Sequence, residues 1–122
     1  MPENNGFVGH KRLIAWEKAD KLVHLTYKVT LSFPKNELFG ITSQLQRAVL
    51  SVPLNIVEGY GRNGKKEFAR FLSISLGSLA EVGYLLEFAQ DLGYINNQDF
   101  EKLFALKERT GQLIWKLYKS IK

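Results

Sequence analysis

The stretch FGITSQLQRAVLSVPLNIVEGYGRNGKKEFARF, residues 39–71, decides the fold of this chain. In its first half, apolar residues recur at spacings of three and four, the pattern of one buried helix face. These residues are Ile41, Leu45, Ala48, Val49, Val52 and Ile56. Pro53 lies inside the pattern, lacks an N–H and frees the carbonyl of Val49, so we expect a kinked helix. Ser51 is close enough in sequence to be a new hydrogen-bond partner for that carbonyl.

A second stripe on the same predicted helix is polar. Its members also recur every three or four residues and are Gln44, Arg47, Ser51, Asn55 and Glu58. The simplest explanation is a bent helix with one face in solvent. A kinked helix could instead direct these polar groups toward a partner, and both explanations stay open.

The segment Gly59-Tyr-Gly-Arg-Asn-Gly64 is predicted to end this helix, because three glycines and an asparagine supply positive-φ positions for a C-cap and turn. The next helix is expected to begin at Lys65. Cations therefore gather around a helix N-terminus, whose free N–H groups favour anions and whose dipole opposes cations. They are Arg62, Lys65, Lys66 and Arg70. We predict a phosphate-binding surface here, with an ordinary solvated charge cluster as the competing explanation.

Two acids and one aromatic residue accompany this cationic turn. Glu58 and Glu67 flank it, and we expect them to neutralise neighbouring cations rather than form an acid/base pair. Tyr60 is an aromatic residue in a basic turn and is able to stack on an unpaired base. Packing over the end of the helix is the equally good explanation for it.

The glycine turn also matches two nucleotide-binding patterns by spacing alone. Gly59, Gly61 and Gly64 have the spacing of a dinucleotide fingerprint, and Gly59, Gly64 and Lys65 have that of a Walker A motif. Both motifs require a strand before the turn, whereas this segment follows a helical pattern. Lys66 also occupies the position where a Ser or Thr must bind magnesium. A nucleotide-hydrolysing enzyme is therefore the least favoured hypothesis.

The composition fits one domain with a real core and is too short for two, at 122 residues. Lys and Arg number 17 against 12 Asp and Glu, and the net charge of +5 permits a nucleic-acid or anionic partner. The chain has no cysteine, and His10 and His24 lack cysteine partners, so we expect no metal and no cofactor. No Ser-His-Asp arrangement can be assigned, and we expect no enzyme.

The first residues carry no signal for export. Residues 1–12 lack the apolar core of a signal peptide, and we see no run of membrane-span length, so we expect a cytoplasmic protein that does not enter a membrane. The same residues are polar and form a predicted flexible tail. Residues 13–122 form the predicted domain.

Three further helices are expected at about residues 13–32, 65–92 and from 97 onward, the last with Asn96 as N-cap. Small residues crowd the middle of the helix at 65–92 and indicate close approach of another helix. They are Ser73, Ser75, Gly77, Ser78, Ala80 and Gly83. The large aromatic residues on apolar helix faces are expected in the core, namely Trp16, Trp115 and Tyr118. Four amphipathic helices without strand patterns predict an all-α, antiparallel up-down four-helix bundle with a Pro-kinked second helix.

Charge is distributed unevenly along the second half of the chain. Residues 71–101 contain five acidic residues and no Lys or Arg, whereas residues 109–122 contain four basic residues and no acid. Opposite ends of neighbouring helices are therefore able to pair electrostatically, within one chain or between copies.

Several blocks of sequence resemble a known family. They are FGITSQ (39–44), RA (47–48), SVP (51–53), NIVEG (55–59), Arg62, EFARFL (67–72), GSL (77–79) and LGYI (92–95). They resemble the four-helix-bundle proteins encoded by intervening sequences of bacterial 23S ribosomal RNA genes, over nearly all of residues 13–120. That family is similar in turn to the accessory variability protein of diversity-generating retroelements. The resemblance implies a ring of subunits, a pentamer, with a basic surface that contacts nucleic acid and without catalytic activity. For a retroelement-linked member it also implies a reverse transcriptase partner.

The sequence therefore predicts a non-enzymatic, homo-oligomeric helix bundle that binds RNA or DNA through phosphate contacts. The predicted contact residues are Arg47, Arg62, Lys65, Lys66 and Arg70. The alternative, from a different class, is a protein-interaction adaptor whose paired helix faces and charge asymmetry serve only assembly with itself or another protein and which has no nucleic-acid role.

Overall fold

The computed structural model describes residues 9–122, and four α-helices account for most of them. They are α1 (Ile14–Thr30), α2 (Ile41–Tyr60), α3 (Lys65–Asp91) and α4 (Asn97–Ile121), with short 3-10 turns η1 (Gly9–Arg12) and η2 (Lys35–Glu37) before α1 and α2. No strand occurs in this part of the chain. The prediction of an all-helical protein with four helices is confirmed.

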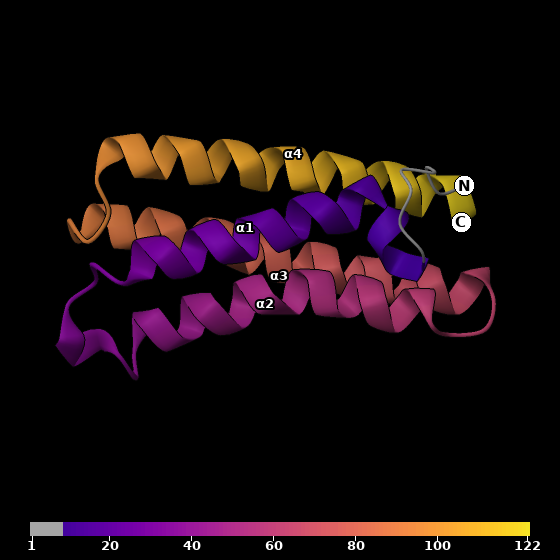
Figure 1. The fold of residues 1–122 in the computed structure, drawn as a ribbon, viewed down its shortest axis with the longest axis horizontal. Helices are drawn as coiled ribbons and strands as arrows, with labels where there is room; N and C mark the ends of the chain where they lie inside the picture. Colours follow the sequence, from indigo (N-terminus) through magenta and orange to yellow (C-terminus); the bar gives the residue numbers. More distant parts are fainter. Residues whose placement is uncertain (1–8) are drawn as a thin grey trace.

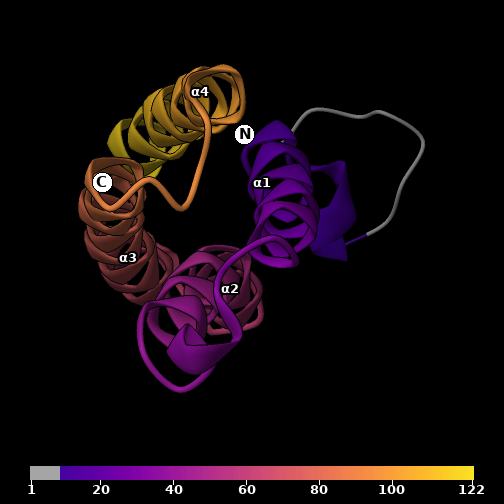
Figure 2. The same cartoon turned by 90° about the vertical axis from the view of Figure 1, so that its left-hand side faces the viewer.

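The four helices lie along one long axis (Figure 1). The α1–α2 and α3–α4 connections lie at one end, and the α2–α3 connection lies at the other end together with the C-terminus (Figure 1). Each helix packs on two others, in the cyclic order α1, α2, α3, α4. The end-on view in Figure 2 shows the helices arranged around a common centre, with α2 and α3 in the most extensive contact.

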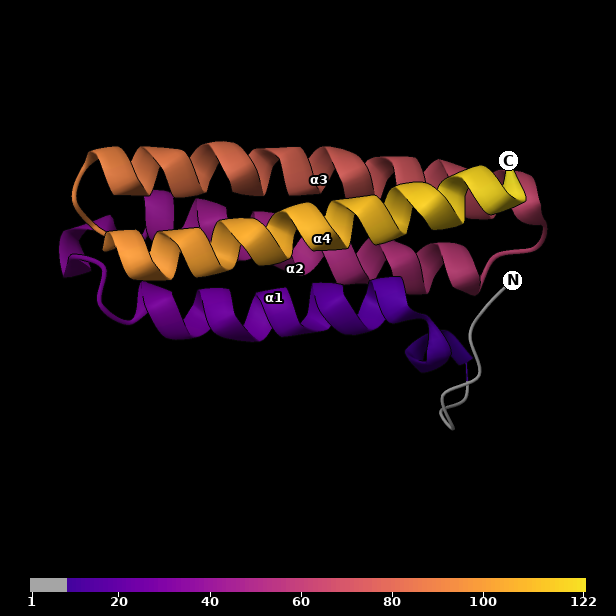
Figure 3. The ribbon, with the colours of Figure 1, turned by 90° about the horizontal axis from the view of Figure 1, so that it is seen from above.

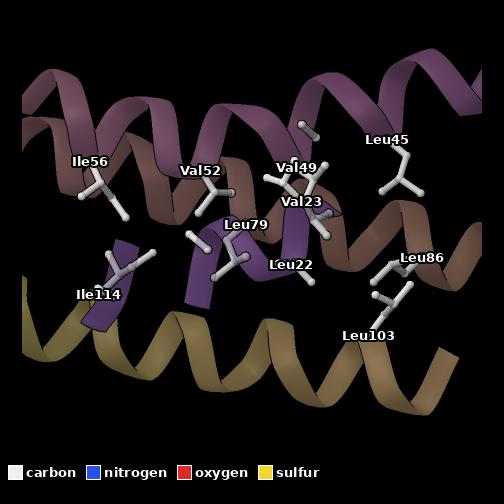
Figure 4. Close-up of a cluster of buried hydrophobic side chains, with 14 of the residues drawn as sticks. Leu22, Val23, Leu45, Val49, Val52, Ile56, Leu79, Leu86, Leu103 and Ile114 are labelled. Atoms are coloured by element: carbon white, nitrogen blue, oxygen red, sulfur yellow. The ribbon is translucent and has the colours of Figure 1, made fainter. Parts of the chain in front are cut away.

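Apolar side chains from all four helices fill that centre (Figure 4). The whole predicted stripe of α2 is buried, and Leu45, Val49, Val52 and Ile56 have no exposed surface. Full burial of a side chain of this size contributes about 1.5–3 kcal/mol to stability. The period of three and four read from the sequence therefore identifies the correct face of α2.

A seam of hydrogen-bonded polar side chains joins α2 to α3. Ser75 Oγ donates to the carbonyl of Val52 at 2.8 Å. Ser51 Oγ and Ser78 Oγ lie 2.8 Å apart. Asn55 Nδ2 donates to Ser51 Oγ at 2.9 Å and to the Ser51 carbonyl at 2.8 Å. These groups satisfy one another inside the contact between two helices, where an unpaired polar group would cost about 1–3 kcal/mol.

This seam changes the interpretation of the polar stripe on α2. Ser51 bonds to Ser78 across the α2–α3 contact and Asn55 bonds to Ser51, and both side chains are half-buried. The exposed members of the stripe are Gln44, Arg47 and Glu58. The hydroxyl of Ser51 is bonded to Ser78 of α3. Ser51 is therefore not the hydrogen-bond partner of the Val49 carbonyl, the role for which the sequence made it a candidate. The small side chains Ser75 and Ser78 do mark a close helix approach, as predicted.

The glycine turn differs from its prediction. Within residues 59–64 only Gly64 has a positive φ, +89°, whereas Gly61 has φ −81°. Among the described residues no residue other than glycine has a positive φ. Gly59 remains inside α2, where a Cβ atom would lie 2.7 Å from Cβ of Phe71 and 3.0 Å from Cδ1 of Phe68. Gly59 is therefore required for close packing against α3, and not for backbone freedom.

The α3–α4 connection has the helix end and the helix cap that the sequence predicts. Gly93 has φ +76° just after α3, and the next N–H, that of Tyr94, donates to the carbonyl of Ala89 at 2.9 Å. Asn96 caps α4, because its side chain accepts a hydrogen bond from the N–H of Asp99 at 2.7 Å.

Two further features concern the predicted tail and the predicted absence of a membrane span. Helix α3 is long and apolar enough to cross a membrane by length and composition, with a mean hydropathy of 1.3 in its best window. The core helix of a bundle passes the same test, and 44% of that window is buried here. Within the predicted tail, Gly9–Arg12 form the turn η1, and residues 1–8 lie outside the described residues.

Candidate nucleic-acid interface

Four of the five predicted phosphate contacts lie together at the α2–α3 connection, and all of them are exposed. They are Arg62 in the connection, Lys65 and Lys66 at the start of α3, and Arg70 one turn further on. Arg47 is also exposed but lies earlier on α2. At 1.5 Å per helical residue it is roughly 20 Å from the cluster, so the structure does not bring it together with the other four.

The two arginines of this cluster both lie over the same aromatic ring. The guanidinium carbons of Arg62 and Arg70 lie 5.1 Å and 4.4 Å from the centre of the Phe71 ring. Arg62 Nη2 also lies 2.9 Å from a carboxylate oxygen of Glu58, and Arg70 Nε lies 3.1 Å from one of Glu67. As expected, the two acids neutralise neighbouring cations, and the arginine side chains are fixed in direction.

Lys65 and Lys66 have no hydrogen-bonding or ion-pair partner within residues 9–122. They begin α3 directly after Gly64, which provides no side-chain cap, so the first N–H groups of the helix remain open to an anion. The hydrogen bond from Arg70 holds the pKa of Glu67 below its usual 4.5, with further help from neighbouring positive charges. The field at this helix start is therefore positive.

Cations from two other segments gather at the same end of the molecule. Figures 1 and 3 both show the C-terminus of α4 and the turn η1 at the end where α2 joins α3. The added cations are Lys11 and Arg12 of η1, Lys116 and Lys119 of α4, and Lys122 directly after α4. The basic run 109–122 is visible in the sequence, but its position beside the glycine turn is not, because only the path of the chain brings the two together.

Tyr60 is a packing residue at this end. Its hydroxyl accepts a hydrogen bond from Arg12 Nη2 at 3.2 Å. Its ring lies edge-on to Phe68, with centroids 6.0 Å apart. The explanation that Tyr60 packs over the helix end therefore fits better than base stacking.

Trp115 is the aromatic residue that the sequence analysis misplaced. It is 51% exposed, although Trp16 and Tyr118 pack partly buried against the core as expected. Trp115 lies one position beyond Ile114, a fully buried residue of α4, so it falls at the edge of the apolar face. Its ring stacks on that of Tyr118, with centroids 5.4 Å apart and planes 20° from parallel.

The glycine turn lacks the surroundings of a nucleotide-binding motif. The residues before Gly59 belong to α2, so the strand that both motifs require is replaced by a helix. Within residues 9–122 no three His, Cys, Asp or Glu side chains are grouped to hold a metal ion.

These features define an all-helical, four-helix protein with a cationic end. The chain belongs to the family of 23S rRNA-intervening sequence proteins, whose family model matches residues 11–116. The family resemblance found in the sequence is thus confirmed, while the further similarity to the accessory variability protein stays a prediction.

The fold is similar to a solved structure, a protein of unknown function from the S23 ribosomal protein family of Bacteroides thetaiotaomicron VPI-5482. The two chains are 21% identical with a TM-score of 0.77, and the match covers 86% of this chain and 98% of that one. This likeness supports the fold alone. No curated protein matches the chain.

Proposed function

We propose that this protein is a non-enzymatic, cytoplasmic, homo-oligomeric helix bundle that binds RNA or DNA through its cationic end. The observation that carries the proposal is the pair Lys65 and Lys66, exposed and forming no ion pair among residues 9–122, at the open N-terminus of α3. Cations at this position oppose the helix dipole by about 0.3–1 kcal/mol each. A bound phosphate removes that opposition and also accepts hydrogen bonds from the free N–H groups.

Arg62 and Arg70 are suited to join such a contact. Their ion pairs with Glu58 and Glu67 are solvent-exposed, with arginine side chains 49% and 54% exposed. Exposed ion pairs of this kind are worth about 0–1 kcal/mol, so a phosphate is able to replace the carboxylate. The stacking on Phe71 keeps each guanidinium in place during the exchange. Arg47 would contact a phosphate further along an extended strand.

The proposal includes an antiparallel up-down arrangement with α2 bent at Pro53. Short connections and the cyclic order of helix contacts support the arrangement. Support for the bend comes from Pro53, which has no N–H to donate to the carbonyl of Val49. The hydrogen bond from Ser75 to the carbonyl of Val52, the residue before Pro53, also supports the bend. It shows that α3 contacts the backbone of α2 directly at this point.

The decisive experiment is binding of an RNA strand and a DNA duplex over a range of salt concentrations. Neutralising five phosphates gives a slope of log K against log salt of roughly −3.5 for a single strand and −4.5 for B-DNA. The double variant Lys65→Ala/Lys66→Ala should make the slope shallower by about 1.4–1.8 and weaken binding roughly 25- to 60-fold at about 0.1 M salt.

The matched control is Lys28→Ala/Lys102→Ala, which removes the same charge from a hollow between α1 and α4 at the other end. It should bind like the wild type. A flat salt dependence, or equal losses in both double variants, would remove the phosphate-binding proposal.

A specific observation also favours the adaptor hypothesis. Large apolar side chains on α2 and α3 are exposed by 40–66%, and they are Leu50, Leu54, Ile74, Tyr84 and Phe88. Exposed apolar residues of this kind suit contacts with further copies of the chain. The family resemblance implies a ring of five subunits and, for a retroelement-linked gene, a reverse transcriptase partner. Static light scattering with and without nucleic acid separates the hypotheses. An adaptor assembles alike in both, whereas our proposal requires the complex to gain the mass of the nucleic acid.

A further inference from the structure

A stacked aromatic pair on α4 is bordered by lysines. Trp115 and Tyr118 stack with their planes 20° from parallel. Lys119 Nζ lies 5.7 Å from the centre of the Trp115 ring, and Lys122 Nζ lies 5.5 Å from that of Tyr118. A ring and a cation are thus presented together on an exposed surface, which is the combination that holds a base next to its phosphate.

The pair lies at a groove between α3 and α4. One hollow of about 370 Å³ is lined by Trp115 and by the small residues Ala80 and Gly111. A second, of about 490 Å³, is lined by Tyr118, Lys66, Arg70 and Ser73. Trp115 and Tyr118 are one turn apart on α4, so the two hollows follow each other along the groove. The second hollow includes two residues of the cationic cluster.

We propose that the α3–α4 groove binds unpaired nucleotides, with a base stacked on Trp115 and the flanking phosphates at the lysines of α4 and at Lys66. This inference rests on the proposed function and adds to it the class of nucleic acid. Stacking on an exposed indole requires a free base face, which a single strand offers and the inside of a duplex does not. The protein should therefore prefer single strands.

A second aromatic pair on the surface provides the contrast. Tyr84 is 66% exposed and stacks on Phe88, with centroids 6.2 Å apart and planes 12° from parallel. Its neighbours one turn away on α3 are Glu81 and Glu87, which repel phosphate. The geometry of the two pairs is similar, and the charge beside them is opposite. Only the Trp115 pair suits a polyanion.

The test uses the variant Trp16→Phe, which leaves Trp115 as the one tryptophan because the chain has two. Oligouridine and a duplex of equal length are added, and tryptophan fluorescence and binding are followed together. We expect quenching of Trp115, tighter binding of the single strand, and a loss of about 5- to 150-fold on Trp115→Ala with an unchanged salt slope. Trp115→Phe should keep most of the affinity, and Tyr84→Ala all of it.

The outcomes separate this inference from the proposed function. Salt-dependent binding with equal affinity for duplex and single strand, and no effect of Trp115→Ala, would overturn the groove and leave the phosphate surface standing. No binding of either nucleic acid would overturn both. Emission of Trp115 at the short wavelength of a buried indole in the free protein would mean that another copy covers the groove, and would also overturn the inference.

Discussion

A single methyl group added at Gly59 is the sharpest test of how α2 meets α3. A Cβ atom at this position would lie 2.7 Å from Cβ of Phe71, 3.0 Å from Cδ1 of Phe68 and 3.3 Å from the Phe68 carbonyl oxygen. Ordinary carbon contacts lie at about 3.5–4.0 Å, so the two backbones must separate by roughly 1 Å. Neither a Cβ atom nor a carbonyl is able to move away by changing rotamer.

Two other glycines make the test quantitative. A Cβ on Gly77 of α3 would meet no atom within 4 Å, and one on Gly83 would meet only the end of the Lys107 side chain, at 3.0 Å. Gly→Ala in a helix interior stabilises by about 1 kcal/mol, and overpacking costs about 1–3 kcal/mol. We expect Gly77→Ala to be stabilised by about 1 kcal/mol and Gly59→Ala to be destabilised by about 0–2 kcal/mol, the overpacking cost less the helix gain. Gly83→Ala should fall between them.

The assay is urea and thermal unfolding followed by circular dichroism at one fixed protein concentration, because self-assembly would make stability depend on concentration. For a chain of this size, 1 kcal/mol corresponds to roughly 4 °C in Tm. Gly59→Ala should therefore melt roughly 4–12 °C below Gly77→Ala. Equal stability of these two variants, or a more stable Gly59→Ala, would refute the close contact at Gly59.

Three further predictions concern single side chains. Ser75→Ala removes the donor to the Val52 carbonyl and should lower the unfolding free energy by about 1 kcal/mol in urea titrations. Asn96→Ala removes the cap of α4 and should lower Tm by roughly 2–8 °C. The pKa of Glu67, followed by carboxyl NMR, should lie below 4.5 and rise toward it in Arg70→Ala. The stabilisation from its lowered pKa is present above the unfolded-state pKa and is lost as the pH falls through the folded-state pKa.

The parts of the fold that depend on neighbouring residues in sequence were predictable. The buried stripe of α2 follows from apolar residues three or four positions apart, and the cap at Asn96 and the end of α3 at Gly93 follow from residues within about a turn. Helix period, capping side chains and positive-φ glycines depend only on residues close together in the chain, so they can be predicted from the sequence.

The parts that depend on a second helix were not predictable. The sequence places Gly59 in a turn, and only the contact with Phe71 shows why glycine is required there. The sequence likewise places Ser51 on a solvated face, and only the position of Ser78 shows that it bonds to α3. Trp115 lies at the edge of an apolar face, where the position of α3 decides its exposure. In the candidate site, four of the five predicted cations are adjacent because they are close in sequence, whereas the lysines of α4 join them only through the path of the chain.

The lysines at the cationic end should lower the stability of the fold while they strengthen nucleic-acid binding. Lys65 and Lys66 stand at a helix N-terminus whose dipole opposes them, and among residues 9–122 neither forms an ion pair. Removing both charges relieves about 0.6–2 kcal/mol of unfavourable interaction at low salt, and alanine is the best helix former. Lys65→Ala/Lys66→Ala should therefore unfold at higher urea concentration than the wild type while it loses nucleic-acid binding. The gain should shrink as salt screens the dipole. If the double variant were less stable, the lysines would hold the helix start together, and their exposure would no longer indicate a phosphate site.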